Sequence, residues 1–224
     1  MQTLVIIGNS HAGRECYYLF KDMLEHDAAL RTTMRFKGFL SHEGYAGNLG
    51  ELSPLLLGDD TDYMPESEDR FAIGIADTGL RRAVYENFQN RGSAFFTLLS
   101  PFAQISRDIR WGDANIIGHG CAFSCGITVG NANYFNSAVI LGHDARIGNC
   151  NFFGPRSSVL GSARIGDGNR AGAHSLVLER ARIGHGNSIA PGAVVYKGCG
   201  NGRFMIGNPA LPDDEAGSLA ADGM

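Results

Sequence analysis

Two different patterns of hydrophobic and polar positions divide the chain. Over residues 1–100, short apolar runs alternate with amphipathic stretches. The runs predict strands over 3–8, 36–40, 71–75 and 94–99, and the stretches predict helices over 11–28 and 78–91. The segment 41–69 is rich in Gly, Asp, Glu and Ser and predicts a loop. This alternation is typical of a small α/β domain with a parallel sheet.

From Ile105 onward the hydrophobic period is six residues, which is neither the helical nor the simple strand period. Every sixth position is apolar without an insertion: Ile105, Trp111, Ile117, Phe123, Val129, Phe135, Leu141, Ile147, Phe153, Val159, Ile165, Ala171, Val177, Ile183, Ile189 and Val195. The residue two positions earlier is mostly small. The pattern predicts very short parallel strands around a narrow apolar interior, a hexapeptide β-helix of the left-handed form.

A longer period of eighteen residues is superimposed on the period of six. Asparagines recur at this spacing, at Asn115, Asn133, Asn151, Asn169 and Asn187. Three hexapeptides make one coil, so we expect about five coils over residues 101–200 with the asparagines stacked along one corner. Arg146, Arg164 and Arg182 share the spacing and are expected to form an outward column. Residues 201–224 are expected to be a C-terminal extension with a disordered tail.

Composition narrows the classes of function. The net charge of −4 argues against general nucleic-acid binding. No apolar run reaches the ~18 residues that span a membrane, and the start MQTLVIIGNSHAG lacks the features of a signal peptide. Five cysteines without a CxxC pair favour reduced thiols. We therefore expect a cytoplasmic protein without membrane insertion.

Two segments carry a resemblance to a known family, FNSAVILGHDARIG (135–148) and MIGNPA (205–210). With the hexapeptide frame, they resemble the left-handed β-helix sugar acetyltransferases, which N-acetylate nucleotide-linked 4-amino sugars or O-acetylate sialic acid. The resemblance implies a Rossmann-like N-terminal domain that binds the nucleotide sugar. It also implies acetyl-CoA as donor, a homotrimer with active sites between subunits, and a role in bacterial surface-glycan synthesis.

His143 is the first candidate catalytic residue. It lies two positions after the core residue Leu141, which places it on the wall or a corner of the β-helix. Asp144 is positioned to hydrogen-bond the imidazole and raise its basicity. By the family pattern His143 is the general base, Asp144 its helper, and Asn136 a sugar contact. From the residues alone, a surface histidine and an asparagine on turns remain the alternative.

The family pattern also suggests residues for the acetyl-CoA site. Phe152 stands where members often have a second histidine, and it cannot donate a hydrogen bond, so an oxyanion would depend on backbone N–H groups. Gly161, Ala173 and Pro191 occupy positions that line acetyl-CoA, although each also fits the repeat as a turn residue. We expect Arg164, in the arginine column, to contact CoA phosphates, with a solvated arginine face as the alternative.

The segment GNSHAG follows the first strand and opens a helix. Gly8 permits the tight turn, and Ser10 and His11 are candidate contacts to the acceptor's diphosphate or ribose. Ser41 and His42 replace the acidic residues that the family often has after the second strand. An acceptor substrate without a nucleotide therefore remains an alternative.

Three other readings remain at this stage: a sialic acid O-acetyltransferase, a non-catalytic trimeric binding protein and a metal-dependent enzyme. The spacing of His119, His174 and His185 indicates no common zinc site, so no metal is expected. No nucleophilic triad is evident, which favours direct acetyl transfer over an acyl-enzyme.

Overall fold

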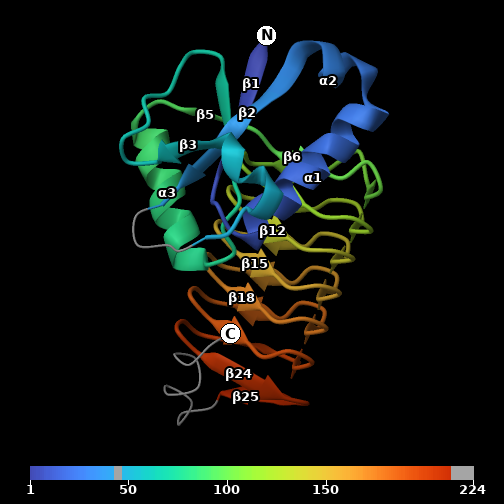
Figure 1. Cartoon of the computed structure of the whole chain (residues 1–224). Helices are drawn as coiled ribbons and strands as arrows, with labels where there is room; N and C mark the ends of the chain where they lie inside the picture. Colours follow the sequence, from blue (N-terminus) through green and yellow to red (C-terminus); the bar gives the residue numbers. More distant parts are fainter. Residues whose placement is uncertain (43–46, 213–224) are drawn as a thin grey trace.

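The computed structural model describes residues 1–42 and 47–212. It consists of an α/β part that lies on the upper end of an elongated β-helix (Figure 1). The α/β part contains β1 (Gln2–Ile7), α1 (His11–His26), α2 (Ala28–Thr33), β2 (Met34–Ser41), a 3₁₀ helix (Gly50–Leu55), β3 (Leu56–Asp59), β4 (Asp69–Ile73), α3 (Thr78–Asn90) and β5 (Ala94–Phe95).

The five strands of the α/β part form one parallel sheet in the order β3-β2-β1-β4-β5. Its central strand β1 is apolar from Leu4 to Ile7 and fully buried, as the sequence predicts. The loop predicted over 41–69 is wrong in part, because the 3₁₀ helix and β3 lie within it. Leu56 and Leu57 of β3 are exposed at the sheet edge, so this strand lacks the buried apolar run by which the others are recognised. Residues 43–46 of that segment lie outside the described residues.

The period of six corresponds to a prism with three walls of short, stacked strands (Figure 1). The first wall contains β6 (Leu98–Leu99), β9 (Ile116–Ile117), β12 (Tyr134–Phe135), β15 (Phe152–Phe153), β18 (Arg170–Ala171), β21 (Ser188–Ile189), β24 (Phe204–Gly207) and β25 (Ala210–Pro212). The second wall contains β7 (Gln104–Ile105), β10 (Ala122–Phe123), β13 (Ile140–Leu141), β16 (Ser158–Val159), β19 (Leu176–Val177) and β22 (Val194–Val195). The third wall contains β8 (Arg110–Trp111), β11 (Thr128–Val129), β14 (Arg146–Ile147), β17 (Arg164–Ile165), β20 (Arg182–Ile183) and β23 (Gly198–Cys199).

Neighbouring strands within a wall come from successive coils and are parallel. The last pair, β24 and β25, is antiparallel. This arrangement fits the left-handed β-helix that the hexapeptide pattern predicts. The predicted apolar positions fill the interior, with one exception. Trp111 is 37% exposed because it belongs to the first coil and is stacked only on Phe123 below it, with the ring centroids 6.0 Å apart.

The predicted asparagine ladder is present and fully buried. From Asn115 to Asn169, each side-chain oxygen accepts the backbone N–H and the side-chain N–H of the asparagine one coil later, over distances of 2.8 to 3.1 Å. A second ladder, which the sequence did not suggest, runs beside it through Asp113, Asn131, Asn149, Asp167, His185 and Asn201. His185 therefore belongs to this ladder, where its Nδ1 accepts the Asp167 N–H at 3.0 Å.

The segment 94–99 is not one strand, as predicted, but two strands in different sheets. β5 pairs with β4 of the α/β part, and β6 pairs with β9 as the first strand of the β-helix. The outward side chains of the first wall, Ile116, Tyr134 and Phe152, pack in one hydrophobic cluster with residues of β1 and α1. This packing covers the upper part of the first wall and leaves the other two walls uncovered.

Arg81 of α3 is fully buried where the two parts meet. Its guanidinium donates to the carbonyl oxygens of Ile73 and Ile75 at 2.7 Å and lies 5.1 Å from the Tyr134 ring centroid. Burial lowers the pKa of Arg81 to about 10. This pKa is still well above neutral pH, so the side chain stays charged. The two hydrogen bonds tie α3 to the end of β4, and the contact with the Tyr134 ring ties it to the first wall.

The ends of the chain also bear on the predictions. The C-terminal extension continues the first wall as β24 and β25, and the predicted disordered tail, 213–224, lies outside the described residues. Across residues 1–42 and 47–212, no helix is both long and apolar enough to cross a bilayer.

We predict that Asn151→Ala lowers the free energy of unfolding by about 2 kcal/mol, because it leaves the buried N–H groups of Asn169 without an acceptor. Asn149→Ala is the matched control, since Asn149 lies two residues earlier on the half-exposed second ladder. Urea unfolding of both variants measures the difference. Equal losses of unfolding free energy in the two variants would show that the buried asparagine ladder contributes no more to stability than the second ladder.

Candidate active site

His143 and Asp144 form a side-chain pair at the corner between the second and third walls. The turn that carries them connects β13 to β14, and Asp144 adopts the left-handed backbone conformation with φ of 58°. His143 Nδ1 lies 2.9 Å from Asp144 Oδ2, and both side chains are more than half exposed. An ionised carboxylate only accepts hydrogen bonds, so Nδ1 carries the proton and Nε2 presents its lone pair as a base.

Glycines in the neighbouring coils make room for this pair. A Cβ atom at Gly161, eighteen residues after His143, would lie 2.5 Å from the imidazole Nε2. A Cβ atom at Gly126, eighteen residues before Asp144, would lie 2.5 Å from its Oδ1. The imidazole therefore lies over the next coil and the carboxylate over the preceding one. The structure thus brings Gly161, expected from the family pattern, together with His143.

The other predicted residues of the acetyl-transfer site lie elsewhere. The corner between the first and second walls carries Asn136, Ala173 and Pro191. The Gly192 N–H donates to the Ala173 carbonyl oxygen there. Arg164 is exposed on the third wall, in register with Arg146 and Arg182, as the column predicts. Within one chain, the second wall separates the His143 corner from the Asn136 corner.

Phe152 is buried on the first wall, away from His143. Its ring packs on Tyr134 with centroids 5.5 Å apart, and the Arg170 guanidinium lies 4.8 Å from its centre. In a single chain Phe152 thus faces the α/β part and lies on a different wall from the His143 corner.

The predicted nucleotide contacts lie at the turn from β1 to α1. Gly8 has φ of 123°, and a Cβ there would lie 2.4 Å from the Gly74 carbonyl oxygen, so only glycine fits. Ser10 is the N-cap residue of α1, yet its buried hydroxyl caps no backbone N–H and has no hydrogen-bond partner among the described residues. His11 is exposed beside it. An unpartnered hydroxyl at a helix start fits a ligand oxygen.

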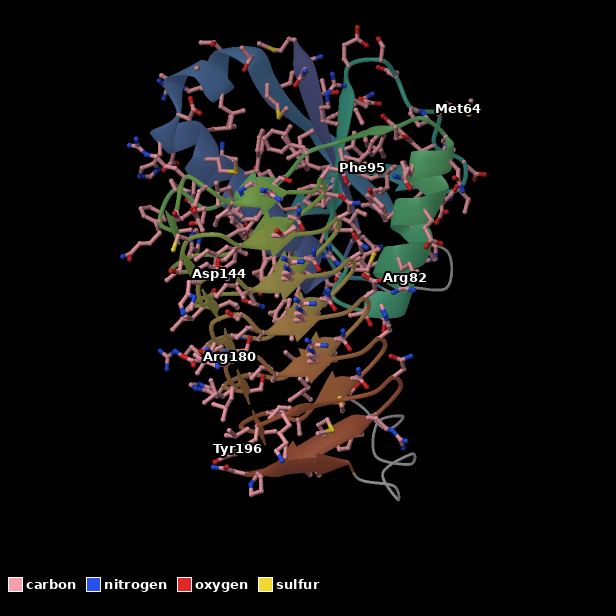
Figure 2. All side chains as sticks on the ribbon, turned by 180° about the vertical axis from the view of Figure 1, so that it is seen from behind. Met64, Arg82, Phe95, Asp144, Arg180 and Tyr196 are labelled. Carbon is pink, nitrogen blue, oxygen red and sulfur yellow. The ribbon has the colours of Figure 1, made fainter. Side chains whose placement is uncertain are left out.

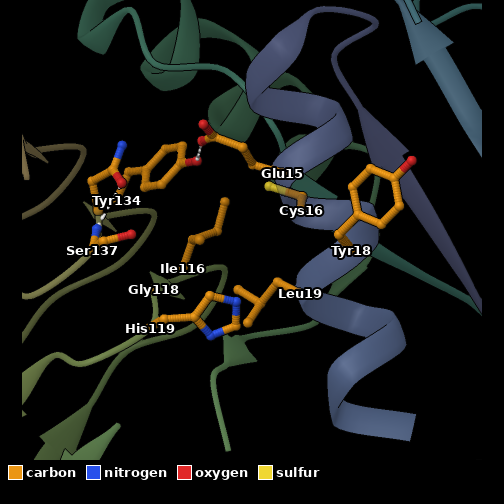
Figure 3. A pocket seen from close by; sticks show the side chains of 10 residues that line it. Glu15, Cys16, Tyr18, Leu19, Ile116, Gly118, His119, Tyr134 and Ser137 are labelled. Carbon is orange, nitrogen blue, oxygen red and sulfur yellow. Dashed lines mark hydrogen bonds between the residues drawn. The ribbon is translucent and has the colours of Figure 1, made fainter. Parts of the chain in front are cut away.

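A cavity that the sequence did not suggest lies between α1 and the first coils (Figure 3). It has a volume of about 210 Å³, and Asn136 lies on its wall. Glu15 of α1 accepts a hydrogen bond of 2.7 Å from Tyr134, which stays protonated because burial raises the pKa of its hydroxyl well above the usual range. Glu15 and Tyr134 are 119 residues apart, so no local pattern could have indicated the contact.

His119 lines the same cavity and connects α1 to the first coil. Its Nδ1 lies 2.7 Å from Ser100 Oγ, and its Nε2 lies 3.2 Å from Asp22 Oδ2. The order Ser100–His119–Asp22 resembles a hydrolytic triad, which the sequence did not predict. Ser100 is only 2% exposed, however, and its oxygen already accepts the Phe102 N–H. A substrate has no access to that hydroxyl, so the three residues serve to join α1 to the β-helix.

The five cysteines are all free thiols. Burial raises the pKa of Cys16 to about 12, which makes its thiol a poor nucleophile at neutral pH. Within residues 1–42 and 47–212, no group of three His, Cys, Asp or Glu side chains is placed to hold a metal ion.

Comparison with protein-family models and with curated proteins finds no match to this sequence. Solved structures do match over nearly the whole chain. PerB of Caulobacter crescentus, in complex with CoA and GDP-perosamine, aligns with a TM-score of 0.83 and 21% identity over 95% of this chain and 98% of its own.

Two further structures are similar to the same extent. The acetyltransferase domain of PglB from Neisseria gonorrhoeae, in complex with acetyl coenzyme A, has a TM-score of 0.80 and 20% identity, over 95% of this chain and 99% of its own. WeeI from Acinetobacter baumannii has a TM-score of 0.79 and 20% identity, over 95% and 100%.

We predict that Gly161→Ala lowers turnover about tenfold or more, because the added methyl group displaces the His143 imidazole. Gly200→Ala is the matched control, since no atom lies within 4 Å of a Cβ there. Steady-state kinetics and thermal unfolding of both variants test this. Full activity of a folded Gly161→Ala variant would contradict the placement of the imidazole.

The comparisons extend over both parts of the molecule, the α/β part and the β-helix. The chain therefore has the fold of the hexapeptide-repeat sugar N-acetyltransferases, which the sequence resemblance predicts.

Proposed function

We propose that this protein is an acetyl-CoA-dependent N-acetyltransferase that acts on the amino group of a nucleotide-linked amino sugar. The observation that carries the proposal is the exposed His143–Asp144 pair, in which Nε2 is free to accept a proton. It occurs in a fold shared with a perosamine N-acetyltransferase whose structure holds CoA and GDP-perosamine. The N-terminal α/β part would act as the Rossmann-like, nucleotide-binding domain, and the reaction would serve bacterial surface-glycan synthesis in the cytoplasm.

The sugar reacts as the neutral amine, because an ammonium group is not a nucleophile, and the attacking nitrogen must then lose one proton to become an amide nitrogen. His143 Nε2 removes a proton from the sugar amine as the nitrogen attacks the thioester carbonyl. Asp144 holds Nδ1–H and stabilises the imidazolium that results. The carbon–sulfur bond then breaks, the amide is formed, and the imidazolium returns its proton to the sulfur of CoA. No covalent acyl-enzyme is needed.

Residues for the two substrates are available at the corners and walls already described. Gly161 of one subunit would line the acetyl-CoA groove with Ala173 and Pro191 of the next, and Arg164 would contact the CoA phosphates. Phe152, on the wall beside that second corner, would border the same groove. Asn136 would contact the sugar, while Gly8, Ser10 and His11 would hold its nucleotide. Since Phe152 cannot donate a hydrogen bond, the negative charge on the carbonyl oxygen would be stabilised by backbone N–H groups.

A homotrimer would complete this site. The outward residues of the second wall are all uncharged: Gln104, Ala122, Ile140, Ser158, Leu176 and Val194. Ile140 is 47% exposed there, beside a hollow of about 580 Å³. Packing this wall against another copy would bring the His143 corner of one subunit to the Asn136 corner of the next.

We predict that the purified protein has the mass of a trimer in light scattering and that Ile140→Glu shifts it to the monomer. A glutamate at this position would bury a charge in the uncharged interface. Thr128→Glu, an exposed substitution on the third wall, serves as the control and leaves the mass unchanged. A monomeric wild-type protein would contradict the shared site.

We predict that His143→Ala lowers turnover by about 10²–10⁴-fold without loss of folding, the range expected for a general base. The assay is thiol release from acetyl-CoA with UDP-, dTDP- and GDP-linked amino sugars and free sialic acid. Release with an amino sugar supports N-acetylation, and release with sialic acid alone would replace it with O-acetylation. A protein that binds no acetyl-CoA would be a binding protein of another kind.

A further inference from the structure

A cleft separate from the His143 corner lies between the start of α3 and the lower coils. Its volume is about 520 Å³. Thr78 and Arg82 of α3 line one side, and Arg170 and His185 of the β-helix line the other. Arg82 lies where the lower end of α3 approaches the coils, on the opposite side of the prism from Asp144 (Figure 2). None of these residues belongs to the proposed acetyl-transfer site, although His185 Nδ1 is part of the second ladder.

The two arginines of the cleft are half-buried and have no carboxylate partner among the described residues. The Arg82 guanidinium lies so close to Gly168 that a Cβ there would be 2.8 Å from its Nη2. Arg170 rests on the Phe152 ring. Charged groups that are partly removed from water are costly unless a counter-charge is present. Two such groups facing one cleft indicate an anionic ligand.

The other polar groups of the cleft include the His185 imidazole, which can donate a hydrogen bond, and the Asp77 carboxylate, which only accepts them. His185 Nδ1 accepts the Asp167 N–H, so the ring proton is on Nε2, which is free to donate. Asp77 lines the cleft and caps α3 by accepting the Leu80 N–H at 2.7 Å. Asp167 accepts the Asn149 N–H at 2.7 Å through Oδ1, and its Oδ2 lies 3.3 Å from His185 Nδ1. Neither carboxylate forms an ion pair with Arg82 or Arg170, so these two guanidinium groups have no paired counter-charge within the chain's described part.

The position of the cleft in the α/β sheet supports the same conclusion. The order β3-β2-β1-β4-β5 reverses between β1 and β4, and ligands of open α/β sheets bind beyond the carboxyl ends of the strands at such a reversal. Gly8 after β1 lies against Gly74 after β4, so the turn with the unpartnered Ser10 hydroxyl and the turn that leads into α3 are neighbours.

We propose that this cleft binds a phosphate group through the guanidinium groups of Arg82 and Arg170 and the Nε2–H of His185. Guanidinium groups match phosphate oxygens in charge and geometry. The phosphate belongs either to a nucleoside diphosphate or to CoA. Only this choice of source rests on the proposed function; the phosphate chemistry follows from the cleft.

The test is calorimetric binding of GDP, UDP, dTDP and CoA to the full chain and to Arg82→Gln and Arg170→Gln. Each variant keeps most of the side-chain length but loses the charge. Arg31→Gln is the matched control, because Arg31 is exposed on α2. Arg82→Lys, which keeps the charge, shows whether bidentate geometry is needed. Thermal unfolding confirms that each variant is folded.

We expect each charge-removing variant to weaken binding of one ligand class by about tenfold or more, and the control to bind as the wild type does. Loss for the nucleoside diphosphates assigns the phosphate to the acceptor, and loss for CoA assigns it to the donor. Unchanged affinity for both classes in folded variants, or no binding of either class to the wild type, would overturn the proposal. His143→Ala should keep this binding, so failure of the catalytic assignment is distinguishable from failure of the cleft.

Discussion

The stacking of successive coils in strict register is the constraint on which the rest of this structure depends. A residue lies above the residue eighteen positions later, and the backbone hydrogen bonds between coils, together with the buried asparagine ladder, hold that alignment. The wall or corner on which a side chain lies is therefore set by its place in the period. The same alignment places His143 over Gly161 and Asp144 against Gly126, so the repeat that stabilises the fold also positions the candidate base.

The period made the β-helix predictable because the apolar position of each hexapeptide has the same structural role. The period did not predict features that arise at the first coil of the β-helix or that use different residue types from coil to coil. Trp111 follows the period but is exposed, since no coil covers the first one. The second ladder combines Asp, Asn and His, so its residue types do not repeat. β3 is not predicted because its apolar run, 55–57, is only three residues long and lies among Pro, Gly and Asp residues that indicate a loop. The segment 94–99 is predicted as one strand because its apolar run hides a change of sheet.

The candidate site was predictable only in part, for a related reason. Local sequence brings His143 and Asp144 together, and their hydrogen bond follows from adjacency. The resemblance implies that Asn136 and Phe152 share a site between subunits with His143, and within one chain they lie at another corner and on another wall. Contacts between α1 or α3 and the coils, such as Glu15 with Tyr134, join residues more than a hundred positions apart. In the proposed trimer, packing of the uncharged second wall against another copy would bring the His143 and Asn136 corners into one site.

The central claim is that one acetyl-transfer site is formed by the His143 corner of one subunit and the Asn136 corner of another. Mixing two inactive variants, His143→Ala and Asn136→Ala, after reversible dissociation tests it directly. If the site is shared, random trimers contain sites with both native residues, and about one quarter of the wild-type activity should return. If both residues act within one subunit, no site regains both, and mixed trimers that remain inactive would contradict the account.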